Sequence, residues 1–213
     1  DSIINHIFKL IYNQQYEEAQ FALSAREELP DSFYADILEI DLCWWEYATL
    51  KESGKSKQLT TFIQDFYQSG DRSDHGKIRQ LIAKSYQIRF ELSRYNIIGA
   101  VIIRSDIRDL LGEIKSEALN YPESRLKLFY LYNTLFDYFE NLFNPFYSET
   151  KRNARADALK ELHNYTSEDD LIVQTLACYF AGRIYMNIEK NPEKGASCFE
   201  ILTEKYPDNQ FFD

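Results

Sequence analysis

The final stretch of the chain carries the pattern that most constrains its fold. Aromatic and small residues recur at helical spacing over residues 179–185 and again over residues 195–202, and residues 206–209 close the second run. Pro207 stands after that run, and proline ends a helix because it lacks an amide hydrogen and clashes with the preceding turn. The stretch therefore predicts one complete helical hairpin.

Composition extends this prediction to the rest of the chain. The 213 residues include only seven glycines and five prolines, which favours long uninterrupted helices over many short strands. A chain of this length buries roughly 70% of its unfolded surface, so one large domain or a short solenoid is feasible. We predict an all-α fold of about ten helices in antiparallel pairs, forming a single domain over residues 1–213.

Apolar periodicity places most of the expected helices. After an N-terminal pair that turns at residues 13–15, the clearest ones cover residues 31–52, 58–68, 74–94, 96–119 and 126–142. Residues 53–57 are expected to form an exposed turn and residues 69–74 a loop. Residues 97–103 could alternatively be a short buried strand, but no partner of similar character exists, so a helix is favoured. Ser148 and the 167–170 segment are expected to cap the last helices before the terminal hairpin.

The terminal hairpin resembles a tetratricopeptide repeat. The positions that match the small, aromatic and proline pattern of that family are Gly182, Tyr185, Gly195, Phe199, Leu202 and Pro207. Two departures are an extra residue in the turn over 187–193 and the size of Leu202, where alanine is usual. The N-terminal pair is similar through Ala19 and Pro30. The resemblance implies a right-handed superhelix of paired helices, with an irregular middle because the interior does not keep strict period.

The whole chain is also similar to uncharacterised tetratricopeptide-type proteins of Gram-negative envelopes. That similarity implies a non-enzymatic scaffold in the periplasm or at the cell surface. A cytoplasmic location is the alternative, because the sequence starts at Asp1 and a leader could have been removed.

Charge narrows the expected partners. The formal net charge of -10 argues against nucleic-acid binding, which needs a basic surface, and against adsorption to anionic membranes. No run approaches the roughly 20 apolar residues of a membrane span. The basic residues of the 151–155 segment, together with Lys160, are interpreted as a solvated helix face.

Catalytic and metal-binding motifs are absent from the sequence. Neither the three histidines nor the three cysteines have the spacing of a metal site: His6, His75, His163, Cys43, Cys178 and Cys198. The cysteines are interpreted as buried small apolar residues, although Cys178 and Cys198 could lie close together on one hairpin. The carboxylates of residues 168–170 fit a helix N-terminus. We therefore expect no catalytic residues, no metal and no cofactor.

Aromatic residues are the one surplus, with 16 Tyr, 15 Phe and 2 Trp. They could fill gaps between helices or provide exposed recognition surfaces. The candidate exposed ligand-binding residues are Tyr130, Tyr132, Tyr138, Phe146 and Tyr147. Two functions remain open: binding of a protein or peptide in a groove between hairpins, or binding of a glycan or other small ligand on exposed rings.

Overall fold

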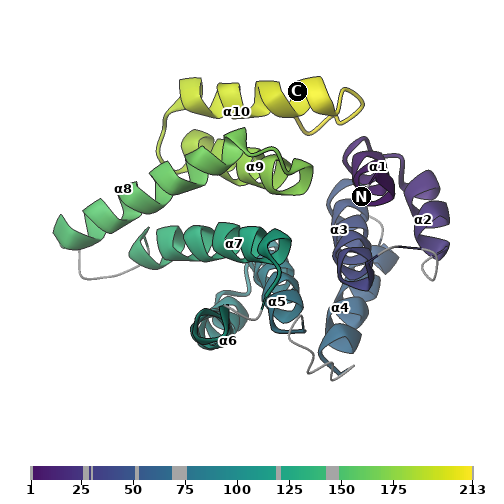
Figure 1. Cartoon of the computed structure of the whole chain (residues 1–213), viewed down its shortest axis with the longest axis horizontal. Helices are drawn as coiled ribbons and strands as arrows, with labels where there is room; N and C mark the ends of the chain where they lie inside the picture. Colours follow the sequence, from purple (N-terminus) through teal and green to yellow (C-terminus); the bar gives the residue numbers. More distant parts are fainter. Residues whose placement is uncertain are drawn as a thin grey trace. The chain divides into compact units, whose positions relative to one another are not determined.

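The computed structural model describes residues 2–25, 29, 31–50, 53–68, 76–118, 121–142 and 149–212. Every regular element among these residues is helical, as predicted (Figure 1). The α-helices are α1 (Ser2–Tyr12), α2 (Tyr16–Ser24), α3 (Ser32–Leu50), α4 (Ser53–Gln68), α5 (Gly76–Ser93), α6 (Ile97–Ser116), α7 (Glu123–Leu142), α8 (Glu149–Asn164), α9 (Leu171–Asn187) and α10 (Pro192–Lys205). The 3-10 helix η3 (Tyr165–Ser167) joins α8 to α9.

Two compact units divide the chain. The first unit comprises residues 1–125 and the second comprises residues 126–213, so the division falls in the first turn of α7. Helices that follow one another in sequence pack together within each unit, as α1 does with α2, α5 with α6, and α9 with α10. None of the helices in the described part of the chain is long and apolar enough to cross a membrane.

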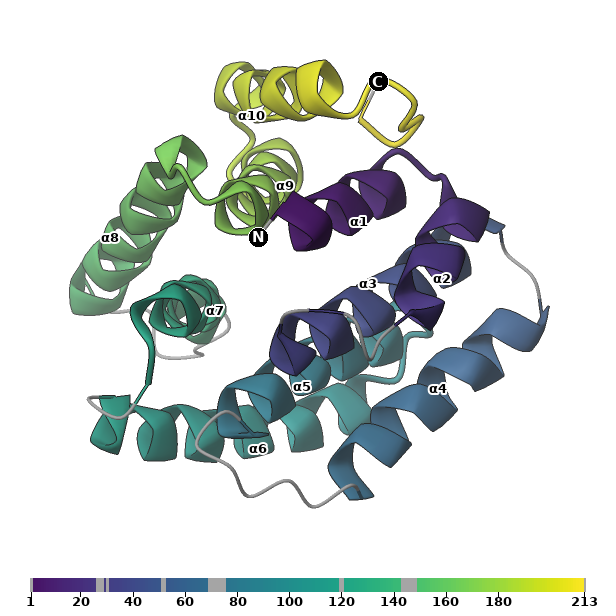
Figure 2. The ribbon, with the colours of Figure 1, turned by 45° about the vertical axis from the view of Figure 1, so that its right-hand side comes forward.

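Helix α3 is the centre of the first unit. It contacts α1, α2, α4 and α5 (Figure 2). Apolar residues cover most of its circumference, including the buried Trp44 and Trp45. Polar contacts connect it to α5: Asp36 pairs with Arg79, and the Tyr47 and Ser93 hydroxyls lie 2.9 Å apart. The prediction that this helix is surrounded by its neighbours is confirmed.

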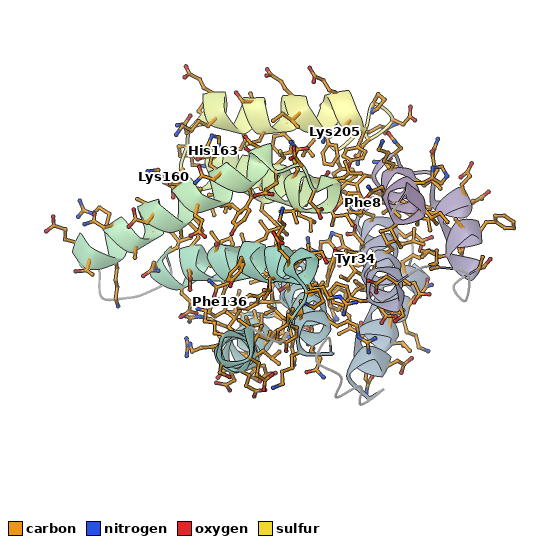
Figure 3. All side chains as sticks on the ribbon, viewed as in Figure 1. Phe8, Tyr34, Phe136, Lys160, His163 and Lys205 are labelled. Carbon is orange, nitrogen blue, oxygen red and sulfur yellow. The ribbon has the colours of Figure 1, made fainter. Side chains whose placement is uncertain are left out.

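Helices α9 and α10 form the tightest pair of the second unit. Asp170 caps α9 by accepting hydrogen bonds from the amides of Ile172 and Val173, which confirms the helix start expected there. A Cβ atom added to Gly195 would lie 3.4 Å from the Gly182 carbonyl oxygen, so the two backbones approach closely. Helix α9 also packs on α8, which carries His163 (Figure 3). The His163 ring meets the Tyr185 ring of α9 edge-on.

The residues chosen for the repeat pattern have varied environments. Ala19, Tyr185 and Leu202 are buried, Gly182 and Gly195 lie in the helix contact, and the Phe199 ring packs on Gly182 while remaining partly exposed. Pro207 is exposed just after α10. Pro30 lies outside the described residues, as does the predicted Ser148 cap.

One local prediction is wrong. Residues 53–57 were expected to form a turn, whereas they are the first residues of α4. Lys55 forms a 2.9 Å ion pair with Glu46 of α3, and Leu59 and Ile63 are buried further along the helix. These tertiary contacts outweigh the weak helix preference of the glycine and serines in the first turn. The helical choice for residues 97–103 is confirmed, since they begin α6.

Candidate functional site

The tyrosines proposed as exposed ligands lie mainly in the core. Tyr130 is 43% exposed, whereas Tyr132 is 3% exposed and Tyr138 is fully buried. The Tyr132 ring packs edge-on against Phe180 of α9. Phe146 and Tyr147 lie outside the described residues. The expectation of exposure is therefore wrong for Tyr132 and Tyr138, because their rings fill the space between α7 and the helices beside it.

Tyr138 belongs to a polar cluster in the second unit. Its hydroxyl donates a 2.5 Å hydrogen bond to Glu189, and Arg155 of α8 lies 3.5 Å from the same carboxylate oxygen. Burial and the neighbouring Glu189 both raise the pKa of Tyr138. The hydroxyl thus stays protonated and serves as a structural donor.

A second polar cluster is enclosed in the first unit. Burial raises the pKa of Asp41 to about 6, although the Tyr86 hydroxyl donates a 2.5 Å hydrogen bond to its carboxylate. Arg89 stacks on the Tyr86 ring at 3.9 Å and also lies over Trp44. A perturbed carboxyl can indicate a catalytic site, but Asp41, Tyr86 and Trp44 are all buried. We interpret this cluster as structural, because a substrate reaches it only if the helices separate.

In the part of the chain that the structure describes, the histidines, cysteines and acidic residues do not gather into a metal site. Among the described residues, no group of three or more histidine, cysteine or acidic residues is arranged to hold a metal ion. Cys43, Cys178 and Cys198 are free, and Cys178 and Cys198 are buried. Burial raises the pKa of Cys178 to about 12, which suppresses the nucleophilic thiolate.

The most distinctive surface lies at the tip of the hairpin formed by α5 and α6. Six apolar side chains are exposed there, with exposed fractions that range from 48% at Leu92 to 88% at Tyr95. We call this set the apolar tip: Leu92, Tyr95, Ile97, Ile98, Val101 and Ile102. Apolar clusters of this kind on a folded chain mark interaction surfaces.

Hydrogen bonds fix the turn that presents the apolar tip. The Asn96 side chain accepts a 3.1 Å hydrogen bond from the Gly99 amide and donates a 2.7 Å bond to the Glu91 carboxylate. A Cβ atom on Gly99 would lie 2.6 Å from the side-chain nitrogen of Asn96, so glycine at that position leaves room for this arrangement of the cap. Tyr95 has a φ angle of 60°, a left-handed conformation that is strained for an aromatic residue.

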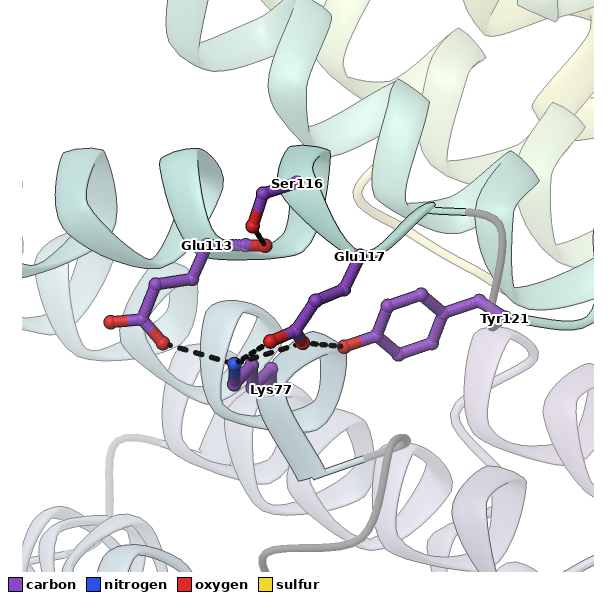
Figure 4. A network of polar contacts seen from close by, with 5 residues as sticks. All are labelled: Lys77, Glu113, Ser116, Glu117 and Tyr121. Atoms are coloured by element: carbon purple, nitrogen blue, oxygen red, sulfur yellow. Dashed lines mark hydrogen bonds and ion pairs between the residues drawn. The ribbon is translucent and has the colours of Figure 1, made fainter.

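Ion pairs hold the two helices of this hairpin together away from the tip. Lys77 at the start of α5 lies 2.7 Å from Glu117 and 3.3 Å from Glu113, both near the end of α6 (Figure 4). The Tyr121 hydroxyl also donates to Glu117, at 3.5 Å. Lys84 and Asp106 form a second pair at 2.5 Å. The apolar tip is thus carried by an antiparallel pair with a defined alignment.

The apolar run at the start of α6 is evident in the sequence, whereas its exposure is not. Ala100, Ile103, Ile107, Leu111 and Ile114 form the buried face of α6. Ile97, Ile98, Val101 and Ile102 repeat at spacings of one and four and lie on another face. A helix that is apolar on two faces needs a partner for each face. The second apolar face of α6 is therefore the sequence feature that could have indicated an exposed surface.

The comparisons with known proteins identify no relative of this chain. No family model matches the chain, and no curated protein or solved structure matches it significantly.

Proposed function

We propose that this chain is a non-enzymatic helical scaffold that binds a protein partner, and that the apolar tip is its docking surface. The observation that carries the proposal is the exposure of six apolar side chains on a turn held by hydrogen bonds. Burying them against a partner would release a large favourable free energy, at about 25 cal/mol per Å² of apolar surface.

An amphipathic helix is the partner element that fits this surface best. Ile97, Ile98, Val101 and Ile102 form a ridge along one face of the first turns of α6. Ridges with this spacing pack into the grooves of a second helix, and helix-in-groove docking is a common mode of peptide recognition. Because the Asn96 cap fixes the start of α6, little ordering entropy is lost on docking.

The glycan alternative has less support. Stacking on a sugar needs exposed aromatic rings, and of the three candidate tyrosines in the described part of the chain only Tyr130 is exposed. Its ring packs on the buried Phe129, with centroids 5.2 Å apart, which leaves less free ring surface. Protein binding is therefore the function we favour.

The tetratricopeptide assignment and the envelope location belong to the same proposal. The contact of Phe199 with Gly182 and the close approach at Gly195 support a repeat-like hairpin for α9 and α10. Cell fractionation of the source organism would test the periplasmic or cell-surface location against a cytoplasmic one.

A photo-crosslinking experiment tests the docking surface. The photoreactive residue p-benzoylphenylalanine replaces Ile98 and, as a control, Phe21, an 81% exposed residue of α2 in the same unit. In cells that naturally produce the chain, we expect a discrete crosslinked protein from position 98 that is absent from position 21.

The identified protein is then purified and titrated with the chain. Ile98→Asp combined with Ile102→Asp should weaken binding at least about tenfold, because each buried aliphatic side chain contributes about 1.5–3 kcal/mol. Phe21→Asp should leave binding unchanged. Full affinity in the double variant would refute the apolar tip as the docking surface, and self-association lost in that variant would identify the partner as a second copy.

A further inference from the structure

A pocket of about 540 Å³ lies in the second unit, where α9, α10 and the segment after α10 meet. Its apolar walls include Met186, Phe199, Phe211 and Phe212, and its acidic residues are Glu200 and Glu204. The pocket is independent of the apolar tip, which belongs to the first unit.

The wall formed by the last residues is held by specific contacts. Thr203 donates a 3.0 Å hydrogen bond to the Phe212 carbonyl, and the Asn209 side chain accepts one of 3.0 Å from the Phe211 amide. Phe212 is 3% exposed and packs on rings that include Tyr206 and Phe199, whereas Phe211 is 49% exposed. One phenylalanine thus anchors the segment while the other remains accessible.

The acidic side of the pocket has a defined arrangement. Glu200 and Glu204 are four residues apart on α10, so both project from the same face of the helix. The two lysines of α10 have other contacts. Lys205 donates to the Gln174 side chain, and Lys194 lies over the Tyr185 ring at 5.4 Å. The C-terminal end of the helix dipole adds negative potential near Glu204.

We propose that this pocket binds an arginine or lysine side chain of a peptide. The aliphatic stem lies along Phe199, Phe211 and Met186, and the cationic group is received by Glu200 and Glu204. Either side chain matches both the apolar and the acidic part of the pocket, because arginine and lysine each combine an apolar stem with a charged end. A guanidinium or ammonium group can also stack on the exposed Phe211 ring.

Other ligand classes fit the pocket less well. An anion would be repelled by two carboxylates, and a wholly apolar ligand would remove them from water without a partner. A small inorganic cation would leave the apolar walls uncovered. The combined lining therefore selects a cation attached to an apolar stem.

The test uses a defined probe and the whole chain. The probe is acetyl-leucyl-arginyl-leucine amide, and its matched control replaces arginine with citrulline, which is nearly isosteric but uncharged. Binding is followed by nuclear magnetic resonance of the isotope-labelled protein, through the amide signals of Thr203 and Phe211. We expect the arginine peptide to shift these signals and the citrulline peptide to bind at least about fivefold more weakly, which corresponds to about 1 kcal/mol for two partly solvated ion pairs.

Charge variants complete the test. Glu200→Gln with Glu204→Gln should reduce affinity for the arginine peptide to that of the citrulline peptide. Asp157→Asn with Glu193→Gln changes the net charge equally at two exposed residues that do not line the pocket, and should retain affinity. Three outcomes overturn the proposal: no binding at millimolar peptide, equal binding of both peptides, or an equal loss in both double variants. None of them bears on docking at the apolar tip.

Discussion

The Phe199 ring lies directly against Gly182, so that a Cβ atom on Gly182 would be 2.9 Å from Phe199 Cε2. The contact pairs the absence of a side chain on α9 with a large ring on α10. Substitutions at the two positions should therefore have non-additive effects on the free energy of unfolding.

Gly182→Ala should destabilise the protein by about 1 kcal/mol, because overpacking of 1–3 kcal/mol exceeds the gain of about 1 kcal/mol in helix propensity. In a Phe199→Ala background the same change should become stabilising, since the ring is gone. Urea unfolding of the single and double variants measures this coupling. The control is Gly112→Ala on α6, where a Cβ atom meets nothing within 4 Å. Additive effects at 182 and 199 would contradict the contact.

The buried carboxyl of Asp41 should make stability depend on pH. Its pKa is raised by burial to about 6 from an ordinary value of 3.8, so the folded chain holds this proton more tightly than the unfolded chain. The stabilisation is complete below pH 3.8 and is lost as the pH rises to about 6. Relative to Asp41→Asn, the wild type should lose about 3 kcal/mol of unfolding free energy across this window. Parallel pH profiles of the two proteins would disprove the assignment.

Two tyrosines of α7 should respond differently to truncation. Tyr138→Ala removes a fully buried ring and the hydrogen bond to Glu189, and should cost about 3–5 kcal/mol. Tyr130→Ala removes a ring that is 43% exposed and should cost no more than about 1 kcal/mol. Thermal and urea unfolding measure both. Similar losses at the two positions would mean that α7 packs through a different face.

Tyr95 offers a test of strain at the apolar tip. Its φ angle of 60° costs an aromatic residue about 1–2 kcal/mol, which glycine avoids at some cost in chain entropy. Tyr95→Gly should therefore raise the unfolding free energy by about 0.5–1 kcal/mol while it weakens partner binding. Equilibrium unfolding and titration with the crosslinked partner check the two effects. A less stable variant would show that the tyrosine ring contributes packing that outweighs the strain.

The sequence predicted the helices well because each depends on local periodicity. The helical choice for residues 97–103, the cap at Asp170 and the packing at Gly195 all follow from spacing and small-residue placement. The first residues of α4 were missed because they include a glycine and two serines, while the ion pair that favours the helix there, between Lys55 and Glu46, is made with the preceding helix. Local propensity carries no information on such contacts.

The candidate site was harder to predict, because exposure is a property of packing. Tyr132 and Tyr138 were chosen for their chemistry, yet they are buried in the second unit. The pocket beside α10 depends on Phe211 and Phe212, whose positions are set by the hydrogen bonds of Thr203 and Asn209. The spacing of residues along α10 does not reveal this wall of the pocket. The wall forms only when the segment after α10 packs against that helix.

The close approach of α9 and α10 also fixes how these helices can be aligned. A Cβ atom would lie 2.9 Å from Phe199 Cε2 at Gly182 and 2.5 Å from Met186 Cγ at Gly195, so each glycine receives a side chain of the facing helix, and a shift along either helix would place that side chain against a residue with a side chain of its own. The helices therefore have one register and no neighbouring register to slide into. We infer that they separate as a unit, and the amide hydrogens of their facing turns should exchange with solvent at a common rate.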